Sequence, residues 1–183
     1  GPVPGVPIAS VWTGNVMIVL LSTSGWRYDP MLDTWTPISM IGAQSATGQS
    51  AVWTGHEVFV WGGANSSARY DPILDTWSPV STVNAPSPRY AFTLIWTGTR
   101  AIVWGGRASG PLNTGGRYDP VSNAWTPTST TGAPSPRELA SAIWTGDRMI
   151  VWGGNAAVAY FNSGGSYDPL TDIWAPTATL HAP

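Results

Sequence analysis

The stretch Trp96-Thr97-Gly98-Thr99-Arg100-Ala101-Ile102-Val103-Trp104-Gly105-Gly106 places a polar turn before a short apolar segment that ends at a glycine doublet. Residues 91–96, on the other side of the turn, are again apolar and rich in residues that favour β-strands. The glycine inside the turn can adopt the positive φ that tight hairpin turns require. The stretch therefore predicts a β-hairpin with a tryptophan near the end of each strand.

The landmarks of this stretch recur in four copies, spaced by about 41 to 49 residues. Trp-Thr-Gly begins at Trp12, Trp53, Trp96 and Trp144, Tyr-Asp-Pro begins at Tyr28, Tyr70, Tyr118 and Tyr167, and each tyrosine is followed seven residues later by Trp35, Trp77, Trp125 or Trp174. The glycine doublet follows Trp61, Trp104 and Trp152, whereas Leu20-Leu21-Ser22 occupies its place in the first copy. Constant spacing within each pair of landmarks predicts two hairpins in every copy. The spacing between the hairpins varies, as expected of surface loops.

Each copy is therefore predicted to form four short strands, which in the third copy cover residues 91–96, 101–104, 116–118 and 124–128. Apolar residues at a sustained helical period are absent from the sequence, so we expect almost no helix. Four-stranded units at this period are typical of a β-propeller, in which twisted sheets stack as blades. The predicted boundaries are a linker or processed N-terminus at 1–7, a degenerate blade 1 at 8–46, blade 2 at 47–86, blade 3 at 87–134 and blade 4 at 135–183.

The composition narrows the class of protein. Hydrophobic residues make up 43% and charged residues 10%, a balance that argues against a disordered chain. The formal net charge is −2, so the sequence lacks the excess of basic residues that is typical of nucleic-acid binding. The apolar runs are too short to span a membrane. The chain has no cysteine, which excludes disulfides, thiolate metal sites and a cysteine nucleophile.

The repeat resembles the Kelch repeat family over residues 8–178. The resemblance is carried by the doublets Gly62-Gly63, Gly105-Gly106 and Gly153-Gly154, and by Tyr-Asp-Pro with a tryptophan seven residues beyond the tyrosine. It implies an all-β, Kelch-type β-propeller with four four-stranded antiparallel blades. It also implies that the loops between the second and third strands (B–C) and before the first strand (D–A) form the recognition surface. Some secreted Kelch propellers accompany a copper oxidase with a tyrosine–cysteine cofactor, which the lack of cysteine excludes here.

Kelch propellers usually contain more blades than the four visible here. Four blades in an open arc would leave an apolar face uncovered at each end, and exposed apolar surface promotes association. Three arrangements stay open: the chain is a slice of a larger ring, two copies close one ring, or four blades close alone. We favour completion by further blades, either in trans or from a longer parent chain.

Two arginines are candidate contacts for a partner. Arg89 and Arg137 end Pro-Ser-Pro-Arg segments before the first strands of blades 3 and 4, and the first two copies lack them. Because an arginine needed only for the architecture is expected in every copy, we predict that these two bind an anionic or carboxylate group. The alternative is a hydrogen bond to loop carbonyls.

The long B–C loops of blades 3 and 4 supply the other candidates: Arg107, Asn113, Asn155, Tyr160, Phe161 and Asn162. Tyrosine and asparagine can bind sugars or peptides by stacking and by side-chain hydrogen bonds. The alternative is that Tyr160 and Phe161 fold back onto the edge of the blade.

No catalytic constellation is predicted. His56 and His181 are the two histidines of the sequence, and neither completes a Ser-His-Asp set. The repeated aspartates Asp29, Asp71, Asp119 and Asp168 are typical of turns, and Asn123 interrupts the second series that a calcium loop would need. We therefore predict no metal and no cofactor.

The predicted function is that of a non-catalytic scaffold for protein–protein binding or self-assembly through the B–C and D–A loops, with a homo-oligomer expected. The alternative is a carbohydrate-binding module, or the propeller part of a carbohydrate-active enzyme, and a metal-assisted hydrolase is a third option. Low charge, the lack of cysteine and lysine, and a surface rich in Thr, Ser, Gly and Pro favour an extracellular or cell-envelope location.

Overall fold

The computed structural model describes residues 7–44, 48–63 and 67–180 of the chain. The predicted linker therefore lies, apart from Pro7, outside the described residues, as does His181. The chain divides into two compact units, residues 1–80 (unit 1) and 81–183 (unit 2), and each is described by itself.

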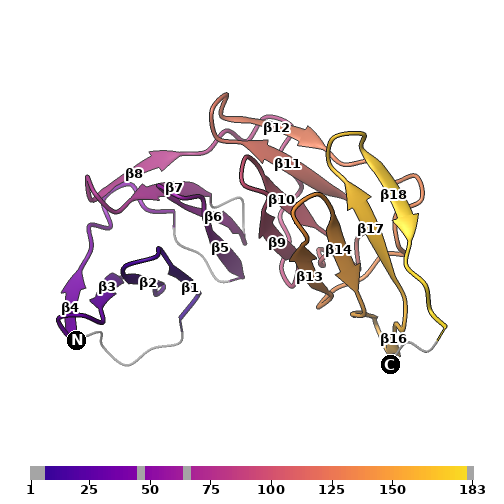
Figure 1. The fold of residues 1–183 in the computed structure, drawn as a ribbon, viewed down its shortest axis with the longest axis horizontal. Coiled ribbons are helices and arrows are strands. Elements are labelled where there is room, and N and C mark those ends of the chain that lie inside the picture. Colours follow the sequence, from indigo (N-terminus) through magenta and orange to yellow (C-terminus); the bar gives the residue numbers. More distant parts are fainter. Residues whose placement is uncertain (1–6, 45–47, 64–66, 181–183) are drawn as a thin grey trace. The chain divides into compact units, whose positions relative to one another are not determined.

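Four antiparallel sheets of four strands form the fold, and one sheet falls within each predicted blade (Figure 1). In unit 1, blade 1 contains β1 (Ala9–Trp12), β2 (Met17–Leu20), β3 (Gly25–Asp29) and β4 (Thr34–Pro37), and blade 2 contains β5 (Gln49–Trp53), β6 (Val58–Gly62), β7 (Ala68–Asp71) and β8 (Thr76–Pro79). In unit 2, blade 3 contains β9 (Thr93–Trp96), β10 (Ala101–Trp104), β11 (Gly115–Asp119) and β12 (Ala124–Pro127). Blade 4 contains β13 (Ser141–Trp144), β14 (Met149–Trp152), β17 (Gly164–Asp168) and β18 (Ile173–Pro176), with the small hairpin β15 (Asn155–Ala156) and β16 (Ala159–Tyr160) inserted.

The strand order confirms the two predicted hairpins per copy. Apart from the hairpin β15–β16, which is inserted between β14 and β17 of blade 4, strands that are neighbours in sequence are neighbours in every sheet, so each blade is a meander. The register follows the landmarks, because Trp96 pairs with Ala101 across the first hairpin of blade 3 and Tyr118 pairs with Trp125 across the second. A tyrosine and a tryptophan seven residues apart therefore face each other, with ring centroids 5.2 Å apart in blade 3.

The first predicted strand of blade 3 is too long. β9 begins at Thr93, while Ala91 has a φ of 54°, a left-handed conformation that a strand residue does not adopt. The described residues contain no helix, so none of them forms a helix long and apolar enough to cross a membrane. A group of three or more side chains that could hold a metal ion is also absent from the described part of the chain.

Within a unit, consecutive blades pack face to face. We call the side of a blade that packs on the preceding blade its leading face, and the opposite side its trailing face. In unit 2 the trailing face of blade 3 packs on the leading face of blade 4, and the buried residues are Ile95, Ile102 and Trp104 from blade 3 and Met149, Val151, Tyr167 and Trp174 from blade 4. Unit 1 repeats this core with Ile18 and Leu20 against Val58, Val60 and Tyr70. Each large apolar side chain removed from water contributes about 1.5–3 kcal/mol.

The hydrogen bonds within the Tyr-Asp-Pro turn explain why its residue types recur. In blade 2, Asp71 Oδ1 accepts hydrogen bonds from the backbone NH groups of Ile73 and Leu74, as predicted for a turn-forming aspartate. Asp75, four residues later, has a φ of 53°, which aspartate and asparagine tolerate better than most residues. Its Oδ1 accepts a hydrogen bond of 2.7 Å from the Tyr70 hydroxyl.

A clamp formed by the same turn holds the segment that leads into the blade. In blade 4, Asp172 Oδ1 accepts the backbone NH of Ser129, and the indole NH of Trp174 donates to the Ser129 carbonyl. The clamp recurs on Ser39, held by Asp75 and Trp77, and on Ser81, held by Asn123 and Trp125. Asn123 serves as well as aspartate because only its carbonyl oxygen is used.

Candidate functional site

The longest loops of blades 3 and 4 join into one surface. We call it the loop rim; it consists of residues 87–91 and 135–139, which precede the first strands, and 105–114 and 153–163, which follow the second strands. Its segments are tied by backbone hydrogen bonds: Gly106 N donates to Arg137 O, Arg137 N to Leu112 O, and Leu139 N to Ala91 O. Segments from both blades are therefore held together as one surface.

Arg89 lies inside the rim rather than on it, with 3% of its surface exposed. Its guanidinium donates to the carbonyl oxygens of Ser87, Gly105 and Thr114, at 3.0, 3.0 and 2.7 Å. Burial lowers the pKa of Arg89 to about 10.

Arg137 repeats this arrangement in blade 4 and is 1% exposed. It donates to the carbonyl oxygens of Ser135, Gly153 and Ser163, at 3.0, 2.8 and 2.7 Å. Its guanidinium carbon lies 4.3 Å from the centroid of the Phe161 ring, a cation–π contact. Burial also lowers the pKa of Arg137.

Both arginines thus make the hydrogen bonds to loop carbonyls that were the alternative to ligand binding. They appear in blades 3 and 4 alone because these blades have the long B–C loops whose carbonyls they bind. We therefore leave Arg89 and Arg137 out of the proposed contact surface, and their predicted contact with an anion stays a prediction.

The two aromatic candidates point in different directions. Phe161 is half-buried against Arg137, so it folds back onto the blade, which was the alternative to ligand binding. Tyr160, at the end of β16, is 85% exposed. Asn162 is exposed, and Asn113 and Asn155 are half-buried. The Oδ1 of Asn155 is buried and has no hydrogen-bond partner among the described residues.

Arg107 forms the ion pair that crosses the rim. Its guanidinium donates to Glu138 Oε1 at 2.7 Å, and this hydrogen bond raises the pKa of Arg107. The backbone of Glu138 in turn exchanges two hydrogen bonds with Asn155. The B–C loop of blade 3 is thereby linked through Glu138 to the B–C loop of blade 4.

Three rim residues other than glycine adopt a left-handed backbone: Ala91, Leu139 and Ala157, with φ of 54°, 56° and 55°. Such conformations cost roughly 1–3 kcal/mol each and are enriched at binding and active sites. For Leu139 the conformation holds a large apolar side chain in an exposed position. Sequence reasoning missed Leu139 and Glu138, although both follow directly after the Pro-Ser-Pro-Arg segment that it singled out.

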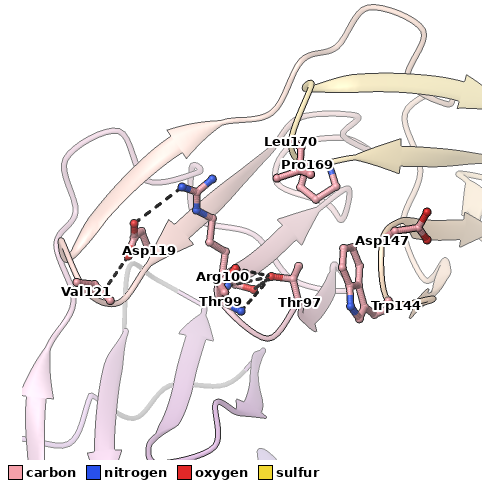
Figure 2. A pocket seen from close by; sticks show the side chains of 10 residues that line it. Thr97, Thr99, Arg100, Asp119, Val121, Trp144, Asp147, Pro169 and Leu170 are labelled. Atoms are coloured by element: carbon pink, nitrogen blue, oxygen red, sulfur yellow. Dashed lines mark hydrogen bonds and ion pairs between the residues drawn. The ribbon is translucent and has the colours of Figure 1, made fainter.

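Apart from the loop rim, unit 2 has a hollow beside the turns that connect the two strands of each hairpin (Figure 2). It has a volume of about 530 Å³ and is bounded by Thr97, Arg100 and Asp119 from blade 3 and by Trp144, Asp147 and Leu170 from blade 4. We call it the turn groove. Arg100 lies 4.0 Å from Asp119, a pair drawn as a dashed line in Figure 2. Unit 1 has a hollow of about 550 Å³ at equivalent positions, with Trp53, His56 and Ile73 in place of Trp144, Asp147 and Leu170.

Comparisons with known proteins agree with this architecture. The family profile of the KLHDC2/KLHL20/DRC7 Kelch-repeats domain matches residues 48–183. The solved structure of YjhT superposes with a TM-score of 0.73 and 15% sequence identity, over 100% of this chain and 68% of that one. At this identity the likeness concerns the fold alone. A search of curated protein sequences finds no match. Together with the four sheets, these findings confirm the predicted Kelch-type β-propeller fold.

Proposed function

Because the chain belongs to the Kelch-repeat family, we propose that it is a non-catalytic scaffold that binds another protein through the loop rim of blades 3 and 4. Kelch repeats serve generally as interaction domains, which supports the class of function. The choice of the loop rim rests on the geometry of unit 2.

The observation that carries the proposal is exposed apolar surface on a rigidly held support. Val158 is 93% exposed and Tyr160 85%, and Leu139 is also exposed. The loops that present them are bonded internally by Arg89 and Arg137. A pre-ordered surface loses little conformational entropy on binding, so exposed apolar and aromatic side chains on it contribute more net affinity.

The Arg107–Glu138 pair gives the rim its polar part. Arg107 is partly exposed whereas Glu138 is largely buried, so Arg107 is the member of the pair that a partner can contact. An interface with an aromatic anchor beside a charged pair matches the usual make-up of protein–protein contacts.

The test is a comparison of two valines of nearly equal exposure. Val158 lies in the rim and Val121, 95% exposed, lies in a turn on blade 3 outside it. Proteins captured by the wild type from the source organism are quantified by mass spectrometry beside the Val158→Asp and Val121→Asp variants. We expect the first variant to lose specific partners and the second to keep them. Equal capture by both variants would contradict the proposed surface.

The turn groove supports carbohydrate binding as a second candidate function. A tryptophan beside carboxylates, threonine hydroxyls and an arginine offers both a stacking face and hydrogen-bond partners for sugar hydroxyls. Tryptophan fluorescence titrations with a panel of oligosaccharides, on the wild type and on Asp147→Asn, test it. Saturable quenching that Asp147→Asn weakens would favour this candidate over the scaffold, while a flat titration with every sugar would remove it.

A further inference from the structure

The clamp on the lead-in segment forms where a blade packs on the blade that precedes it in the chain. Ser39 stands two residues after the end of β4, and Ser129 stands two residues after the end of β12. Each of them donates its backbone NH to the aspartate of the following blade and accepts the indole NH of that blade's tryptophan. Both interactions use the backbone of the bound segment. The serine Oγ makes a separate local hydrogen bond, which it accepts from the backbone NH two residues further on. Ala178 has no such oxygen, but it keeps the backbone NH and carbonyl that the clamp uses.

Blade 4 presents the same segment without a clamp. Ala178 stands two residues after the end of β18, is exposed, and has no hydrogen bond from its backbone within the described residues. Blade 1 has the complementary clamp without a segment. Asp33 Oδ1 accepts the Tyr28 hydroxyl at 2.9 Å, as in the other blades, but in the described part of the chain no backbone NH fills its second position. The indole NH of Trp35 likewise has no acceptor there.

The apolar faces beside these groups are uncovered in the same way. Ile143 of blade 4 occupies the position of Ile95 in blade 3, but it is 61% exposed where Ile95 is 7% exposed. Trp152 is half-buried, whereas Trp104 at the equivalent position is fully buried. The ring centroids of Trp104 and Trp174 are 5.1 Å apart. The leading face of blade 4 covers those residues of blade 3.

The leading face of blade 1 is the matching surface. Its Tyr28 is half-buried, whereas the tyrosines at the equivalent position of the other three blades are fully buried. Tyr28 and Trp35 keep the paired arrangement of the covered blades, with ring centroids 4.8 Å apart. A surface built for blade packing is thus present in blade 1 without the blade that would fill it among the described residues.

We propose that the chain associates head to tail, with the leading face of blade 1 of one copy docking on the trailing face of blade 4 of a second copy. This association goes beyond the proposed function, and it uses a surface other than the loop rim. In the contact, Asp33 accepts the backbone NH of Ala178, Trp35 donates to the Ala178 carbonyl, and the Trp35 ring packs on Trp152. The contact continues in trans the packing that blades 3 and 4 make within the chain.

One position of blade 1 departs from the repeat. Trp26 stands where blades 3 and 4 have Gly116 and Gly165, and a side chain at these glycines would collide with Pro86 and Pro134 of the lead-in segments. The contact between these glycines and the prolines is therefore not part of the proposed interface. The proposal is confined to the clamp and to the stacked rings.

The first experiment measures molar mass by light scattering over a concentration series. The wild type is expected above the monomer mass of 19.4 kDa, and Asp33→Ala is expected to weaken association by about tenfold or more, because a charge-assisted hydrogen bond is lost. Asp33→Asn is expected to associate as the wild type, since Asn123 fills this role in blade 3. Asp147→Ala, which removes an exposed carboxylate outside the clamp, is the matched control, and circular dichroism checks that all variants fold.

The second experiment tests the head-to-tail geometry. Ile143→Arg places a charge on the trailing face of blade 4 and is expected to be monomeric. Mixing it with Asp33→Ala is expected to restore association, because one contact in the mixture joins two unmodified faces.

A monomeric wild type at all concentrations would overturn the proposal, and so would association that Asp33→Ala and Ile143→Arg leave unchanged. Failure of the mixture to associate would overturn it as well. Loss of partner capture by Val158→Asp concerns the loop rim alone, so the two proposals fail independently.

Discussion

Replacing Arg137 by methionine is expected to loosen the B–C loop of blade 4. The guanidinium donates to three carbonyl oxygens, those of Ser135, Gly153 and Ser163, and is almost fully buried. A buried acceptor left without a partner costs about 1–3 kcal/mol. Methionine fills a similar length of space, so the cavity contribution is small. Removing a buried charge, whose cost is visible in the lowered pKa of Arg137, offsets part of the loss.

The net expectation is a loss of roughly 3 kcal/mol in the free energy of unfolding of unit 2, with local opening of the loop before that. Urea unfolding measures the first quantity, and hydrogen exchange read by mass spectrometry measures the second. Exchange should accelerate at the amides of Gly153 and Phe161, which are bonded within the loop, and stay unchanged in the B–C loop of blade 3. Arg100→Met, at a partly exposed arginine, should change stability by less than about 0.5 kcal/mol. If Arg137→Met costs less than 1 kcal/mol, or if exchange in the loop is unaltered, the arginine does not hold the loop.

Three further substitutions have defined outcomes. Gly116→Ala should destabilise the protein by about 1–3 kcal/mol in urea unfolding, because its Cβ would lie 2.8 Å from Pro86, whereas Gly110→Ala, which meets nothing within 4 Å, should be neutral. Asn123→Asp should keep the melting temperature within a few degrees and Asn123→Leu should lower it clearly, since the leucine offers no oxygen to the clamp; equal melting temperatures for both would refute the clamp. Tyr167→Phe should reduce the loss of stability at alkaline pH. Burial, and after it the hydrogen bond to Asp172, raises the pKa of Tyr167 above the ordinary value of 10.0. The contribution of the protonated hydroxyl to the free energy of unfolding is therefore present below pH 10 and is lost as the pH rises through the folded-state pKa. Urea titrations between pH 8 and pH 11 on both proteins check this, and parallel curves would contradict it.

Several site predictions depended on information that spacing does not carry. The sequence singled out Arg89 and Arg137 from their absence in the first two copies, and the structure relates that absence to the long loops whose carbonyls they bind. Tyr160 and Phe161 are adjacent and similar in chemistry, yet one is exposed and the other packs on Arg137. The roles of the candidate residues in binding a partner stay predictions, as does the extracellular or envelope location.

What could be derived from the sequence alone was the set of four meanders and their registers. Constant distances such as Tyr70 to Trp77 encode turn length, and turn length determines which residues face each other across two strands. These relations are local, so a repeated pattern suffices to predict them. The clamp on Ser129, the burial of Arg137 and the turn groove each join residues that are far apart in the chain. They depend on how one sheet packs on the next, and residue spacing within a single copy contains no information about that packing.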